Sequence, residues 1–284
     1  MTTIKSKLLV LALPFMLGGI ASAQVGIGAV QSDERRNTLN DLAAHKLTLP
    51  PTELETLLRG ALSDEDPDIR QRGLWVVSGR AGVLRFAPTD ENRATWRAER
   101  SVLVALRPRI LESLSEPTLK VRLAAIAALG NLDYAPGVSG VRAVSISAST
   151  AHALARMYLT EPSPAARAEA MKAFALLTPP QTHGFEPETL ATIAAGLSDQ
   201  NADVVQIAAL GVGNLRMRML LPKVAVLLKS ESKGVRLAAA QSIGAFGPQA
   251  AQYAADVEDA VSQETDPVMR QALQNVGKRL RGGH

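Results

Sequence analysis

The stretch LSDEDPDIR, residues 62–70, determines how the rest of the chain can be interpreted. It ends an apolar segment with Leu62, continues through a short acidic turn, and places a Pro where the first turn of a helix accepts one. An apolar residue and Arg70 follow. Five further segments align with it on the position of Arg70, namely those around Arg122, Arg167, Val205, Arg236 and Arg270. The chain therefore contains an internal repeat.

The aligned positions also agree on either side of this anchor. The residue six positions earlier is acidic in five of the six segments, as Asp64, Glu116, Glu161, Asp199 and Glu264, and is Ser230 in the other. After the anchor, stretches such as VRLAAIAALGNL (121–132) and VRLAAAQSIGAF (235–246) place small and large apolar residues on one face at helical spacing. Each segment therefore predicts a turn followed by a second amphipathic helix.

This pattern resembles the HEAT repeat, in particular the bacterial HEAT-like units called PBS-lyase-type, over about Thr52 to Leu280. The resemblance implies an all-α, armadillo-like helical solenoid, a superhelix of about six HEAT-like helical hairpins. It also implies a structural ladder between neighbouring repeats, in which turn acids meet second-helix arginines. On the matching positions, Asp64, Glu116, Glu161, Asp199 and Glu264 would meet Arg70, Arg122, Arg167, Arg236 and Arg270. Val205 and Ser230 depart from the pattern, so we expect interruptions there.

The spacing of the anchors indicates where the stack is irregular. Successive anchors lie 52, 45, 38, 31 and 34 residues apart, which places insertions in the N-terminal half. We expect insertions at 79–92 and 133–149, a break at 178–187, and a long helix after the first insertion that kinks at Pro108. Residues 24–51 would hold a leader and a capping helix from Asp33 to Lys46, and residues 52–281 the solenoid.

The first 23 residues look like a secretory signal peptide. Lys5 and Lys7 precede an apolar run from Leu8 to Ile20, and Ala21-Ser22-Ala23 supplies small residues at a cleavage position. The alternative is a membrane anchor, but the apolar run is shorter than the roughly 20 residues of a spanning helix. We therefore expect cleavage after Ala23, a periplasmic or secreted protein, and no stable insertion in the membrane afterwards.

Charge and cysteine content narrow the possible functions. The chain carries a net charge of +4, and loss of the first 23 residues with their two Lys lowers it to +2, which argues against nucleic acid as a partner. With no Cys, the chain forms no disulfide and has no thiolate metal site or Cys nucleophile. The four His residues form no metal-binding motif, and no catalytic or nucleotide-binding motif is present. We therefore expect no catalytic residues, no cofactor and no metal.

The most distinctive stretch is residues 80–109, with seven Arg against three acids. Arg and Trp are enriched at interface hot spots, so this stretch is the candidate partner surface. Its proposed residues are Trp75, Arg85, Phe86, Arg93, Trp96, Arg97 and Arg100. The alternative is a solvated Arg-rich helix whose Trp fills a gap between irregular repeats.

The function most consistent with these observations is a non-catalytic interaction scaffold in the cell envelope. It would bind a partner protein through the solenoid surface and would be monomeric without that partner. One alternative, suggested by the resemblance, is an enzyme or enzyme subunit related to the HEAT-like bilin lyases. Another is nucleic-acid binding as in HEAT-like DNA glycosylases, which the charge disfavours.

Overall fold

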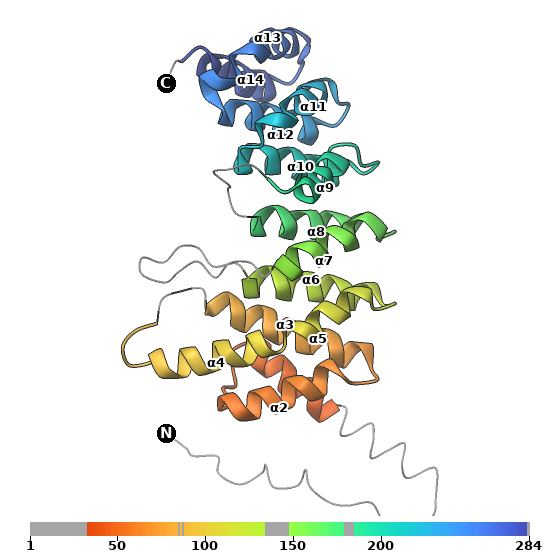
Figure 1. Ribbon diagram of the computed structural model, residues 1–284, viewed down its shortest axis with the longest axis vertical. Coiled ribbons are helices and arrows are strands. Elements are labelled where there is room, and N and C mark those ends of the chain that lie inside the picture. Colours follow the sequence, from red (N-terminus) through yellow and green to blue (C-terminus); the bar gives the residue numbers. More distant parts are fainter. Residues whose placement is uncertain (1–32, 85, 87, 134–147, 179–184, 283–284) are drawn as a thin grey trace, which may run out of the picture.

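The computed structural model describes residues 33–84, 86, 88–133, 148–178 and 185–282. These residues form helices, short 3-10 segments and turns, and none of them lies in a strand. The helices form hairpins stacked along one axis, from the N-terminal repeats in orange to the C-terminal repeats in blue (Figure 1). The predicted all-α solenoid is therefore confirmed.

Each of the six aligned segments forms one hairpin, whose first helix precedes the acidic turn and whose second helix carries the anchor. The hairpins are α2 (Pro51–Leu62) with α3 (Pro67–Val83); α4 (Arg93–Ala105), α5 (Arg107–Glu112) and η1 (Ser113–Ser115) with α6 (Leu119–Asp133); α7 (Ala148–Thr160) with α8 (Pro164–Leu177); α9 (Pro187–Gly196) with α10 (Ala202–Leu215); η2 (Arg218–Leu220), α11 (Leu221–Val226) and η3 (Leu227–Lys229) with α12 (Lys233–Ala245); and η4 (Gly247–Tyr253) and α13 (Ala254–Gln263) with α14 (Pro267–Leu280).

The hairpins stack so that like helices lie beside like helices. The second helices α3, α6, α8, α10, α12 and α14 contact one another in that order. The first helices form the other layer, where α2 contacts α4 and α7 contacts α9. The core lies between the two layers and runs the length of the stack, because each repeat buries its apolar face against its neighbours.

Capping residues define where the second helices begin. Four positions before the anchor, Asp66, Ser163, Asn201, Ser232 and Asp266 each accept a hydrogen bond from a backbone N–H of the first helical turn. Such a bond satisfies an amide that has no partner within the helix and stabilises the helix by about 1 kcal/mol. The turn between the helices of these hairpins is therefore encoded locally.

Small residues allow the second helices to approach closely. A Cβ added to Gly213 in α10 would lie 2.8 Å from the Cα of Ser242 in α12. The equivalent position, eight residues past the anchor, is also small in the earlier repeats, as Ser78, Gly130 and Ala175, and again in the fifth, as Gly244. In α14 the same position is Lys278, and the exposed residues Gln271, Gln274 and Asn275 lie near it. The last repeat thus has a polar outer face, as terminal repeats require.

The irregular regions differ in part from the expectation. The second helix of the first repeat continues to Val83, so the first insertion begins after that residue and not at Gly79. The long helix expected after this insertion breaks at Leu106, and Pro108 lies in the first turn of the helix that follows. The second insertion and the break after Thr178 fall mostly on residues 134–147 and 179–184, outside the described residues, as do the proposed signal peptide and leader.

A helix over residues 33–43 covers the open end of the first repeat. Leu39 and Leu42 on this helix are fully buried, together with Leu54 and Leu58 of α2. The helix is shorter than the expected Asp33 to Lys46, because His45 adopts a positive φ of 56° that a continuing helix does not allow.

Candidate partner-binding surface

The arginine at the anchor of one repeat meets the turn acid of the next. Arg122 contacts Glu161 through Nε–Oε2 at 2.7 Å and Nη2–Oε1 at 2.8 Å, and Arg167 contacts Asp199 at 2.9 and 3.0 Å. Single contacts complete the series, Arg70–Glu116 at 2.7 Å and Arg236–Glu264 at 2.9 Å. The ladder thus runs in one direction and joins repeats, with no rung inside a repeat.

Each rung also holds its own turns together. Arg122 Nη1 donates to the carbonyl oxygens of Glu116 and Pro117 at 2.8 and 2.9 Å, in the turn just before its own helix. On the other side, Glu161 Oε1 accepts from the backbone amide of Ser163 at 2.9 Å. One Arg–Glu pair therefore fixes two successive turns, and this assigns the ladder a structural role.

The two departures from the pattern belong to a single rung. Val205 occupies the arginine position of the fourth repeat and Ser230 the acid position of the fifth, and these positions would pair with each other. The ladder is therefore interrupted once among the described repeats, and because both members of that rung are uncharged, neither an Arg nor an acid is left unpaired in it. The close approach of Gly213 to Ser242 lies in this same interface, between α10 and α12.

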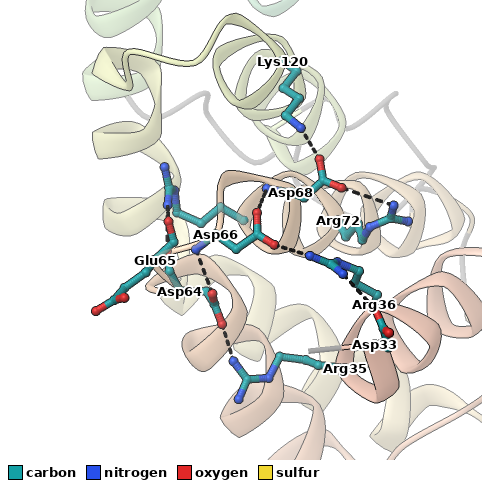
Figure 2. Close-up of polar contacts among 10 residues, drawn as sticks. Asp33, Arg35, Arg36, Asp64, Glu65, Asp66, Asp68, Arg72 and Lys120 are labelled. Carbon is teal, nitrogen blue, oxygen red and sulfur yellow. Dashed lines mark hydrogen bonds and ion pairs between the residues drawn. The ribbon is translucent and has the colours of Figure 1, made fainter. Parts of the chain in front are cut away.

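The acidic turn of the first repeat has no earlier repeat to provide an Arg. The helix over residues 33–43 provides Arg35 and Arg36 instead. Figure 2 shows Arg35 directed to Asp64 and Arg36 to Asp66, with an Arg36 Nη2–Asp66 Oδ2 distance of 2.5 Å. Asp68, two residues after Asp66, forms ion pairs with Lys120 of the second repeat and with Arg72 of its own helix (Figure 2). The acidic turn is thus neutralised from both sides. At the other end, Arg270 is exposed and donates to the carbonyl oxygen of Glu264.

The rungs shift the pKa of the carboxyl groups that they hold. Burial pushes the pKa of Glu161 upward, but hydrogen bonds from Arg122 and the Ser163 amide outweigh burial, and the pKa lies below its ordinary value. Asp199 follows the same balance: burial raises its pKa, and Arg167 and the Asn201 amide lower it further than burial raises it. Both groups are therefore ionised at neutral pH.

Most arginines of residues 80–109 are engaged within the fold. Arg80 pairs with the nearly buried Glu99, and Arg93 contacts Asp90 at 2.5 Å on the surface. Arg107 binds Asp133, whose side chain is fully buried, and Arg109 contacts Glu112 at 2.6 Å and the carbonyl oxygen of Leu62 at 3.0 Å. The excess of positive charge in this stretch therefore serves partly to attach α4 and α5 to the neighbouring helices.

The two tryptophans have different environments. Trp96 is partly buried against the core, and its Nε1 has no hydrogen-bond partner among the described residues. Arg100, one turn later, lies over the Trp96 ring at 5.6 Å from its centroid, and burial lowers the pKa of its guanidinium. Trp75, in contrast, is 47% exposed on α3. Trp96 thus acts largely as a packing residue, whereas Trp75 is available to a partner.

Two large apolar side chains of α3 are exposed, and together with Phe86 after the helix they are called the α3 stripe below. Val83 follows Trp75 by eight residues, two turns along α3 and about 80° round its axis, and is 53% exposed. Phe86 follows the end of the helix and is 75% exposed. The exposed Arg97 lies on α4. Arg85 lies outside the described residues. Of the six candidate residues that the structure describes, Trp75, Phe86, Arg93 and Arg97 are therefore exposed, and Arg93 already pairs with Asp90.

The described residues offer little to a catalytic mechanism. They contain no group of three or more His, Asp or Glu placed to hold a metal ion. A shallow depression of about 380 Å³ lies beside the Arg167–Asp199 rung and is lined by Tyr158 and Leu159 among others. Tyr158 donates to Asp199 at 3.2 Å, and burial together with that carboxylate raises its pKa to about 12, so it stays protonated. None of the helices in the described part of the chain has the length and apolar character needed to span a bilayer.

Comparison with known proteins agrees with this geometry. The model of the HEAT repeat family matches residues 189–277, from within α9 to within α14. No curated protein matches the chain. Over the matched segment the resemblance to HEAT repeats is confirmed, and the chain as a whole has the fold of HEAT-like and armadillo repeat solenoids.

Solved structures support the same fold over most of the chain. An archaeal HEAT-like repeats protein from Thermococcus onnurineus NA1 is 16% identical, with 88% of this chain and 97% of that chain covered and a TM-score of 0.55. A designed armadillo repeat protein in complex with the peptide (KR)4 is 15% identical, with 80% and 99% covered and a TM-score of 0.55. An engineered protein is 17% identical, with 81% and 97% covered and a TM-score of 0.56. Solenoids of this kind commonly bind proteins and are typically non-catalytic.

Two features were not anticipated from the sequence. The first is the row of capping residues from Asp66 to Asp266, which the polar residue four positions before every anchor could have indicated. The Arg35 and Arg36 contacts carried no such signal, since they join a segment outside the repeats to the first turn.

Proposed function

We propose that this protein is a non-catalytic interaction scaffold of the cell envelope, which binds a partner protein through the surface of its N-terminal repeats. The observation that carries the proposal is the stripe of Trp75, Val83 and Phe86, all about half exposed or more. Exposed aromatic side chains of this kind supply much of the binding energy where proteins associate.

The ladder prepares this surface for binding. Arg70 and Lys120 join α3 to the second repeat, and the N-terminal helix joins it to the end of the stack. A surface whose backbone is already held in place loses little conformational entropy when a partner binds. The bound (KR)4 peptide of the designed armadillo protein illustrates, for that protein, a ligand on a repeat solenoid of the same fold.

Placement in the cell envelope rests on the N-terminal sequence. Lys5 and Lys7, the apolar run to Ile20 and the small residues before Gln24 have the order of an export signal. N-terminal sequencing of the protein from envelope fractions tests this part separately, and an uncleaved chain in the cytoplasm would contradict it.

Crosslinking mass spectrometry in intact envelopes tests the scaffold itself. A partner crosslinked near α3 is expected from the native chain and should be lost in a Trp75→Ala, Phe86→Ser variant. Leu159→Ser is the matched control, because Leu159 is 61% exposed on α7, away from the stripe. A chain that gives no crosslinked partner in the native form, or that loses it equally with the control, would contradict the proposal.

A further inference from the structure

The fifth repeat concentrates positive charge in a chain that is otherwise nearly neutral. Residues 216–236 contain six basic residues and one acid, Glu231, a larger excess than in residues 80–109. They form η2, α11, η3 and the first turn of α12. This segment belongs mainly to the layer of first helices, whereas Trp75 lies on a second helix.

Half of these cations already have partners. Arg216 donates to the carbonyl oxygen of Ala245 and lies over the Phe246 ring. Lys233 contacts Asp266 at 2.5 Å, and Arg236 forms the rung with Glu264. The other three, Arg218, Lys223 and Lys229, are exposed and make no ion pair with a described residue.

Two apolar side chains project among the three unpaired cations. Met219 is 76% exposed and Val226 is 71% exposed, although Leu220, Leu221, Val224 and Leu228 of the same segment are buried. The segment therefore has one face in the core and an opposite face of alternating cationic and apolar residues. A face with cations beside projecting apolar side chains combines the electrostatic and the apolar attraction that hold peripheral proteins at an anionic membrane surface.

We propose that this face, defined by Arg218, Met219, Lys223, Val226 and Lys229, docks on the surface of an anionic lipid bilayer. The three unpaired cations beside Met219 and Val226 favour an anionic bilayer, because such a surface offers phosphates to the cations and an apolar interior to the two side chains at once. The lysine and arginine head groups meet lipid phosphates while the apolar side chains enter the interface.

Acidic residues on the neighbouring first helices make the basic face a local feature of the fifth repeat. Glu188 on α9 and Asp256 and Asp259 on α13 belong to the neighbouring first helices, and Glu231 follows Lys229 closely. The contact is therefore small and peripheral. Because it uses the layer of first helices, it leaves the α3 stripe on the second-helix layer free, and it does not depend on the partner proposed above.

Vesicle cosedimentation of the chain without residues 1–23 tests the proposal, because the apolar run from Leu8 to Ile20 would itself enter a bilayer. Binding is expected to vesicles of phosphatidylcholine with phosphatidylglycerol, to weaken in high salt, and to be much lower on phosphatidylcholine alone. Lys223→Gln and Lys229→Gln should each lower the partition coefficient about fivefold, the effect of one cation near an anionic surface. Met219→Ser with Val226→Ser should lower it further at either salt concentration.

Two controls separate this face from other parts of the chain. Arg97→Gln removes an exposed cation from α4, and Leu159→Ser removes an exposed apolar side chain from α7, and both should bind vesicles like the native chain. Equal loss with the controls, or no preference for anionic vesicles, overturns the proposal. Binding to polyglutamate without binding to anionic vesicles also overturns it and assigns the face to an acidic protein. A Trp75→Ala variant should bind vesicles normally even if it loses its protein partner.

Discussion

Arg122 in the second repeat holds the carboxylate of Glu161 in the third with two hydrogen bonds, at 2.7 and 2.8 Å. The Glu161 side chain is 3% exposed and that of Arg122 is 13% exposed, so water competes little for either group. A bidentate pair in such surroundings defines the relative position of two repeats more strictly than apolar packing alone, because both the distance and the plane of the two groups are set.

We predict that Glu161→Gln destabilises the protein by roughly 3 kcal/mol, since removing one charge of a buried pair leaves the other without compensation. Urea denaturation followed by circular dichroism measures this loss. Glu55→Gln is the matched control, because Glu55 pairs with Arg59 at the surface, and such pairs contribute less than about 1 kcal/mol. Equal losses of unfolding free energy in the two variants would show that the rung stabilises the protein no more than a surface ion pair does.

The missing rung between the fourth and fifth repeats can be installed. We expect Val205→Arg alone to destabilise the chain, because Val205 is 8% exposed and the new charge would face Ser230. Adding Ser230→Glu should recover stability beyond the sum of the single effects, by on the order of 1 kcal/mol. A double-mutant cycle by urea denaturation provides the measurement, and a coupling energy near zero would refute the assignment of these two positions to one rung.

The pKa shifts predict how stability depends on pH. Because Glu161, Asp199 and Glu264 have lowered pKa values in the folded chain, their contribution is complete above the ordinary carboxyl range near pH 4. The contribution is lost as the pH falls through the lowered values and the carboxylates accept protons. Melting temperatures measured from neutral pH down to about pH 3 should fall steeply for the native chain. They should fall less steeply for a Glu161→Gln, Asp199→Asn variant, and parallel curves would contradict the prediction.

Two glycine substitutions should have opposite signs. Gly213→Ala places a Cβ 2.8 Å from the Ser242 Cα, so α10 and α12 must separate, and we expect a loss of about 1 to 3 kcal/mol. Gly60→Ala on α2 meets nothing within 4 Å and should stabilise the protein by up to about 1 kcal/mol, since alanine favours the helix. Thermal denaturation of both variants checks the signs, and a stabilising Gly213→Ala would rule out close helix contact at that position.

The repeat in the sequence was sufficient to predict the hairpins, their turns and the residue types of the ladder. Helical periodicity, a capping residue before each second helix and a recurring Arg act over a few residues, so they can be read along the chain. The same local reasoning predicted an interruption at Pro108, and the structure places it two residues earlier, at Leu106, because the first turn of a helix accepts proline.

Only the tertiary structure decided which groups meet. The direction of the ladder, the union of Val205 and Ser230 in one rung, and the contacts of Arg35 and Arg36 with Asp64 and Asp66 all join residues about 25 to 46 positions apart. It also divided the arginines of residues 80–109 into paired and exposed ones and separated the packed Trp96 from the open Trp75. The reason is physical: propensity and periodicity act on neighbouring residues, whereas pairing and exposure depend on which repeat stacks against which, and how closely.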